Sequence, residues 1–117
     1  MKKIPTPYLE DILKSIQLIE AYLEKIDKNK QIFEADTEKQ DSIIRRLEII
    51  GEATKRLRTD FTDQFANIPW RKMTGMRDVL IHDYDEVDLE LVWNVVIDEL
   101  PELKRSINKI IAADSSI

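Results

Sequence analysis

The one histidine of this chain lies five residues after an arginine, in the stretch MRDVLIHDY that spans residues 76–84. A histidine with a pKa near neutrality can take up or release a proton, and a guanidinium can neutralise charge on phosphate oxygens. Arg77 and His82 are therefore the candidate catalytic residues. On an unbroken helix, five residues correspond to about 500° of rotation, which leaves these positions about 140° apart. A shared site requires either a helix that unwinds around His82 or two chains that meet at this motif.

Asp78 is the candidate supporting residue. It lies four residues before His82, so its carboxylate could orient the imidazole and favour the protonated form of the histidine. The spacing alone leaves an alternative open. His82 can be a partly exposed residue at a helix C-terminus, and Arg77 can simply pair with Asp78 or another acid.

The length and composition predict one folded domain over residues 1–117. Apolar residues make up 43% of the chain and charged residues 35%, with two glycines and no low-complexity run, which favours a strongly helical fold over disorder. No stretch is apolar enough to span a membrane, and residues 1–12 lack the apolar core of a signal peptide, so we expect a cytoplasmic protein. The absence of cysteine and the single histidine argue against disulfides and metal sites, and we expect no cofactor.

Apolar residues at spacings of three and four predict helices along most of the chain. In the first helix, Thr6 has the form of an N-cap ahead of Pro7, and the apolar stripe extends to about Asp27. Thr37 and Gln40 have the spacing of a capping box that opens a second helix. We expect both helices to bury one apolar face.

The second half of the chain predicts two more main helices. Residues 59–68 have the features of a short helical turn, and Pro69 suits the first position of the third helix, which contains the motif. Asp85 or Asp88 could cap the fourth, which Pro101 should break or kink. The predicted fold is an all-α, antiparallel up-and-down bundle of four main helices with a short connecting helical turn.

Three residues are expected to serve packing. Gly51 lies inside the second helix at a cost of about 1 kcal/mol relative to alanine, which suggests that another backbone or side chain packs closely there. Trp70 and Trp93 are expected to anchor the core or an interface rather than to stack on nucleic-acid bases.

Charge is unevenly distributed along the chain, whose formal net charge is −5. Residues 45–77 carry eight Arg or Lys against four acidic residues, whereas residues 78–102 carry nine acidic residues and no Arg or Lys. The basic segment is compatible with phosphate contacts, although solvated surface charge is a simpler explanation. The candidate phosphate contacts are Arg45, Arg46, Lys55, Arg56, Arg71 and Lys72.

Longer strings around the motif resemble the HEPN superfamily, and specifically its HepT-like toxin branch. The similarity is carried by IIRRLEIIGEATKRL (43–57), by IPWRKMTGMRDVLIHDYDEVDLELVW (68–93), and by the LP pair at 100–101. It covers the domain from the second helix onward. The first helix matches in its general pattern.

The motif itself matches the resemblance residue by residue. Members of the superfamily share Arg-x4-6-His with a polar residue after the arginine, which corresponds here to Arg77, Asp78 and His82. The HepT-like branch extends this to Arg-x4-His-x-Tyr, which adds Tyr84. The resemblance implies a HEPN-like domain that acts as a metal-independent ribonuclease, with the motif of each chain at a cleft between two subunits.

The resemblance also implies a partner and a form of regulation. The partner would be a nucleotidyltransferase-type antitoxin of the MNT–HEPN toxin–antitoxin pairs, which attaches AMP to the motif tyrosine, here Tyr84. A bulky anion at that position would block the cleft. Two alternatives stay open: a non-catalytic helical module that binds a nucleotidyltransferase, and a structural dimer without catalytic function.

Overall fold

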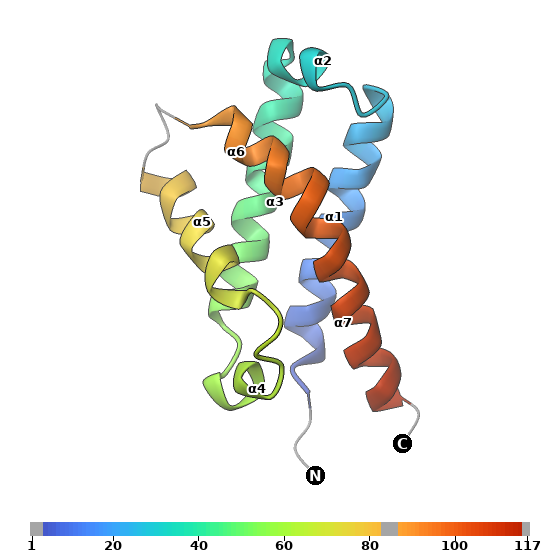
Figure 1. Ribbon diagram of the computed structural model, residues 1–117, viewed down its shortest axis with the longest axis vertical. Coiled ribbons are helices and arrows are strands. Elements are labelled where there is room, and N and C mark those ends of the chain that lie inside the picture. Colours follow the sequence, from blue (N-terminus) through green and yellow to red (C-terminus); the bar gives the residue numbers. More distant parts are fainter. Residues whose placement is uncertain (1–3, 83–86, 116–117) are drawn as a thin grey trace.

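A computed structural model describes residues 4–82 and 87–115, except for the side chains of residues 81, 82 and 115. The described residues form an all-α bundle with principal extents of 49 × 29 × 21 Å. Its long helical segments run alternately up and down, and the two ends of the chain lie at the same end of the bundle (Figure 1). The predicted fold class is confirmed. Within the described residues, no helix combines the length and apolar character needed to cross a membrane.

The first helix, α1 (Thr6–Lys25), lies against α3 (Thr37–Lys55) and α7 (Leu100–Ser115). Its predicted N-cap is wrong by one position: Pro5 occupies the cap, and the helix already begins at Thr6. Because the cap is a proline, no side chain accepts a hydrogen bond from the first turn.

A short helix that the apolar pattern did not predict, α2 (Lys30–Ala35), connects α1 with α3. It also changes how α3 begins. Asp36, not Thr37, is the N-cap, and its Oδ1 accepts a hydrogen bond from the backbone N–H of Lys39 at 3.1 Å. The predicted capping box is therefore wrong. The side chain of Gln40 instead donates to the backbone carbonyls of Phe33 and Glu34, at 2.9 and 3.0 Å.

The predicted helical turn after α3 is α4 (Thr59–Gln64), and the motif helix is α5 (Trp70–His82). Pro69 precedes α5 instead of occupying its first position. Trp70 is buried, and its Nε1 donates to the carbonyl of Phe65 at 3.1 Å. The expectation that Trp70 serves packing is confirmed.

The last helical segment comprises α6 (Leu89–Asn94), a π-helical turn labelled η2 (Val95–Glu99), and α7. Asp88 caps α6 through hydrogen bonds from two backbone N–H groups. Asp85, the other proposed cap, lies outside the described residues. The wider π turn ends two residues before Pro101, whose ring would clash with the carbonyl four residues earlier in a regular α-helix. The predicted irregularity near Pro101 is thus a local change of helix type, after which the chain continues as α7.

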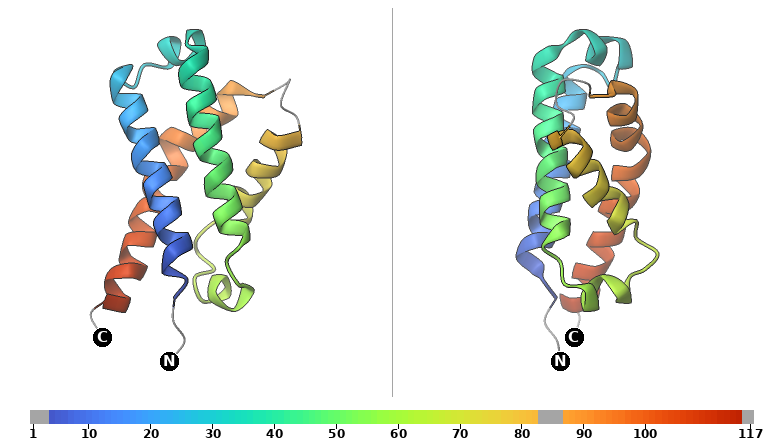
Figure 2. Two further views of the ribbon diagram at one scale, coloured as in Figure 1. Left: turned by 180° about the vertical axis from the view of Figure 1, so that it is seen from behind. Right: turned by 90° about the vertical axis from the view of Figure 1, so that its left-hand side faces the viewer.

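One apolar core fills the space between these helices. Its largest fully buried side chains come from α1, α2, α3, α5 and α7, and Trp93 of α6 packs on Phe33 of α2 with ring centroids 5.3 Å apart. Figure 2 shows α5 standing beside α3 and away from α1. The motif helix is therefore positioned mainly by its contact with α3. The largest fully buried side chains are Leu9, Ile12, Ile16, Ile19, Phe33, Ile43, Leu47, Ile50, Met73, Leu80, Leu100 and Leu103.

Candidate functional site

The motif begins on the face of α5 that packs against α3. Met73, Met76 and Leu80 are buried at spacings of three and four, so they form the apolar stripe of α5. Arg77 lies one turn after Met73, at the edge of this stripe. Its side chain is 23% exposed, so most of it is covered by the fold.

The two helices approach each other most closely at Gly51. A β-carbon built on this residue would lie 2.1 Å from Cβ of Arg77 and 2.9 Å from the carbonyl oxygen of Met73. This confirms the prediction that another chain segment packs closely against Gly51. The catalytic candidate Arg77 thus lies at the crossing point of α3 and α5.

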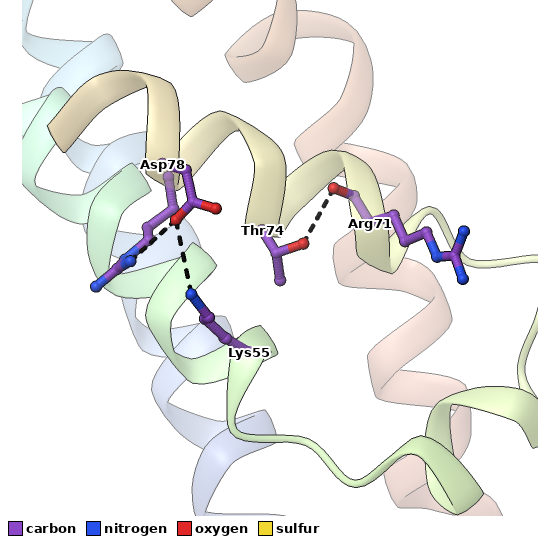
Figure 3. A network of polar contacts seen from close by, with 5 residues as sticks. Lys55, Arg71, Thr74 and Asp78 are labelled. Atoms are coloured by element: carbon purple, nitrogen blue, oxygen red, sulfur yellow. Dashed lines mark hydrogen bonds and ion pairs between the residues drawn. The ribbon is translucent and has the colours of Figure 1, made fainter. Parts of the chain in front are cut away.

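Asp78 fixes the outer end of the Arg77 side chain. Nη1 of Arg77 donates a hydrogen bond to Oδ1 of Asp78 at 2.9 Å, and Nζ of Lys55 lies 3.9 Å from the same oxygen (Figure 3). One carboxylate therefore lies close to two cations from neighbouring helices. The alternative in which Arg77 pairs with Asp78 describes this contact correctly.

The backbone of α5 is helical through His82. Of the two ways to bring Arg77 and His82 together, a helix that unwinds before or at His82 is therefore not observed. The side chain of His82 and all of Tyr84 lie outside the described residues, as do the contacts predicted for them. The position of His82 on the helix can still be compared with that of its neighbours.

Positions 78 and 82 are four residues apart and differ by only about 40° around the axis of α5. The Arg77 position is about 140° from the His82 position, but its guanidinium reaches Asp78. The charged end of Arg77 is thus bound to a residue whose position is only about 40° from position 82 around the helix axis. Sequence spacing alone describes the Cα positions and misses this reach.

The structure separates the candidate phosphate contacts from one another. Lys55 is next to the Arg77–Asp78 pair, whereas the side chain of Arg71 extends away from it (Figure 3). Lys72 forms an ion pair with Glu99 of the π turn. Lys55 could have been singled out from the sequence, because it lies four residues after Gly51 and so shares the face of α3 that meets α5.

Arg56 also forms an ion pair, away from the Arg77–Asp78 pair. Its guanidinium forms an ion pair with Glu52 at 3.4 Å, one turn earlier on α3. Both side chains are well exposed, so the pair is screened by solvent and holds Arg56 loosely. Of Lys55, Arg56, Arg71 and Lys72, Lys55 is therefore the best placed as a phosphate contact beside the Arg77–Asp78 pair.

Comparison with known proteins identifies relatives over nearly the whole chain. Residues 12–110 match the family described as Ribonuclease HepT-like. The chain is 43% identical to the probable ribonuclease HepT of Thermococcus cleftensis, over 94% of this chain and 98% of that protein. It is 46% identical over 94% of its length to a Methanocaldococcus jannaschii protein named gamma-glutamylcyclotransferase and putative RNase. The match covers 49% of that relative, so this chain spans about half its length. No solved structure matches the chain significantly.

Proposed function

Because this chain belongs to the HepT-like ribonuclease family, we propose that it is a metal-independent endoribonuclease toxin of a toxin–antitoxin pair. Arg77 and His82 are the catalytic residues, and Asp78 supports them. The active unit is a homodimer with the site at the cleft between its subunits. RNA is the substrate.

The proposed reaction needs no metal ion. The 2′-hydroxyl of a ribose attacks the adjacent phosphorus while His82 accepts its proton, and Arg77 stabilises the additional negative charge on the phosphoryl oxygens. The bond from phosphorus to the 2′-oxygen forms and the bond to the 5′-oxygen breaks. The leaving 5′-oxygen must receive a proton, and His82 of a second subunit can supply it.

The observation that carries this proposal is the contact of Arg77 with Asp78. It holds a guanidinium beside the helix face on which position 82 lies, although the Arg77 position itself faces α3. Lys55 adds a second cation at the same place. Together with the proposed proton acceptor His82, these two cations would suit an anionic transition state.

Regulation is proposed to act on Tyr84, two residues after His82. A nucleotidyltransferase-type antitoxin would transfer the adenylyl group of ATP to its hydroxyl and release pyrophosphate, which leaves a negatively charged phosphodiester on the tyrosine. RNA phosphates would then be excluded by like charge and by bulk. The modified protein would be inactive until the AMP is removed.

A second candidate function is a non-catalytic helical module that binds a nucleotidyltransferase. It is favoured by the ion pairs of the basic residues: Lys55, Arg56 and Lys72 each have an acidic neighbour. These contacts, together with the net charge of −5, reduce the attraction of the protein for bare RNA.

One assay separates the two functions. Purified protein is incubated with RNA in EDTA, and the parent is compared with His82→Ala and Arg77→Ala. Cleavage by the parent and its loss in both variants are expected for the ribonuclease. If the parent, tested with and without its genomic partner, cleaves no more than the variants, the binding module is supported and the enzyme is rejected.

A further inference from the structure

Gly51 is buried in the middle of α3 and faces α5. Glycine is the least favourable residue after proline in a helix interior, so its presence needs a reason. Among the described residues no glycine has a positive φ. The backbone at position 51 therefore does not require glycine, and the reason must lie in the space around it.

That space is occupied by stiff parts of α5. A β-carbon at position 51 would lie 2.1 Å from Cβ and 2.9 Å from Cγ of Arg77, and 2.9 Å from the backbone oxygen of Met73. Two of these three atoms, the Cβ and the backbone oxygen, cannot move by rotation of a side chain. An added methyl group would therefore have to displace the backbone of α5 at Arg77.

Gly75 provides the contrast within the same helix pair. A β-carbon built there meets no atom of the described chain within 4 Å. Alanine at position 75 would thus fit without displacement. Of the two glycines, Gly51 alone lies where an added β-carbon would clash, and the clash is with Arg77 and Met73.

The position of the Arg77 guanidinium depends on how closely α5 packs against α3. Its Nε is buried and has no hydrogen-bond partner among the described residues. Its Nη1 is bound to Asp78, the next residue on the same helix. Lys55, which belongs to α3, approaches the same carboxylate at 3.9 Å. A shift of α5 relative to α3 would separate this carboxylate from Lys55 and move Arg77 as well.

We propose that Gly51 is a positioning residue for Arg77: it allows α5 to approach α3 closely enough to place the guanidinium for catalysis. This inference rests on the proposed ribonuclease function, in which Arg77 is catalytic. Gly51 itself touches neither substrate nor reacting atoms. It acts through the distance between the two helices.

The test is a double-mutant cycle with Gly51→Ala and Arg77→Ala, measured as single-turnover RNA cleavage by protein in excess. Displacement of Arg77 by about 1 Å should slow the parent reaction about 10²-fold. Arg77→Ala loses most of its activity, so its residual rate is followed over long incubations with protein in large excess. In that background the same change should alter the residual rate less than about twofold, because the group it acts through is gone. Alanine at position 77 keeps the β-carbon, so the 2.1 Å clash is present in both backgrounds.

Gly75→Ala is the matched control, since it makes the same substitution where a methyl group fits. It should cleave RNA at the parent rate. All variants are compared by circular dichroism and thermal unfolding, and rates are measured well below the lowest unfolding midpoint. An equal loss of rate from Gly51→Ala in both backgrounds would show that Gly51 acts independently of Arg77 and would overturn the proposal.

A second readout does not depend on activity. In protein labelled with ¹⁵N, the Nε–H resonance of Arg77 reports the surroundings of its buried Nε. It should shift in Gly51→Ala and stay in place in Gly75→Ala. An unshifted resonance in folded Gly51→Ala would overturn the positioning role. If the parent itself cleaves no RNA, the ribonuclease proposal fails, and this resonance still decides whether Gly51 positions Arg77.

Discussion

Arg77 donates a hydrogen bond from Nη1 to Oδ1 of Asp78, its immediate neighbour on α5, at 2.9 Å. The same oxygen lies 3.9 Å from Nζ of Lys55 on α3. This carboxylate orients the catalytic candidate, and it also brings a negative charge close to the two cations proposed to meet the RNA phosphates. The two effects act on different kinetic constants, so they can be separated.

Asp78→Asn should lower kcat without raising KM. Asparagine keeps the size of the side chain but removes the charge that holds the guanidinium, and misplacement of a catalytic group can cost about tenfold to a hundredfold in rate. Removal of a carboxylate should at the same time ease the approach of phosphates. Steady-state cleavage of a short RNA measures both constants. An unchanged kcat would show that Arg77 needs no help from Asp78.

Lys55→Gln should weaken RNA binding, whereas Arg71→Gln should not. Each variant removes one positive charge, but Lys55 lies beside the Arg77–Asp78 pair and Arg71 extends away from it (Figure 3). Loss of one phosphate contact should reduce the slope of log affinity against log salt by about 0.7 for single-stranded RNA. Fluorescence anisotropy at several salt concentrations measures the slope. Equal effects of the two variants would mean that only overall charge matters.

A mixed dimer of Arg77→Ala and His82→Ala chains should recover part of the activity that each homodimer lacks. If a site takes Arg77 from one chain and His82 from the other, one of the two sites in the mixed dimer is complete. Recovery is then at most about half of the parent rate per dimer. The recovered rate is lower than this if a second His82 must protonate the leaving 5′-oxygen, because the mixed dimer has only one His82. Two affinity tags allow the mixed dimer to be isolated; if it is as inactive as the homodimers, a composite site that works with a single His82 is excluded.

Co-expression with the proposed partner, a nucleotidyltransferase-type antitoxin, should add the mass of one or more adenylyl groups to the protein. Tandem mass spectrometry should place them on Tyr84, and the modified protein should no longer cleave RNA. Tyr84→Phe is the control, because it removes the hydroxyl and keeps the ring. Modification of the Phe variant, or full activity of the modified parent, would contradict regulation through this residue.

Asp36→Ala should lower the free energy of unfolding by about 1 kcal/mol, a usual value for loss of an N-cap. The carboxylate of Asp36 accepts the hydrogen bond from Lys39 that caps α3. Thr37→Ala is the control, since Thr37 is already inside the helix and caps nothing. Urea unfolding followed by circular dichroism gives both values. A larger loss of unfolding free energy for Thr37→Ala than for Asp36→Ala would instead support the capping box predicted from the sequence.

The sequence predicted the main helices because each carries an apolar stripe, and periodicity reports burial directly. It failed at helix ends, where Asp36 and Thr37 are both good caps and only the path of the chain decides between them. It also missed α2, whose six residues are too few to show a period and which is held by contacts with Gln40 and Trp93.

The site was predictable in part. The glycine at position 51 indicated a close contact, and the motif indicated Arg77 and Asp78. Which residue would fill that contact was not predictable, because it depends on how α3 and α5 cross. The position of Lys55 follows from the same crossing and became visible only with the two helices in place.

Acidic residues on several helices form ion pairs within the fold itself. Glu90 and Glu99 pair with Lys30 of α2 and Lys72 of α5, and the carboxylate of Glu20 on α1 pairs with Lys104 of α7 at 2.9 Å. Part of the negative charge is thus compensated locally, which makes the charge of the surface differ from one patch to the next. An approaching polyanion would respond to these patches more than to the overall charge, and its orientation on the protein would be selected before any chemistry begins.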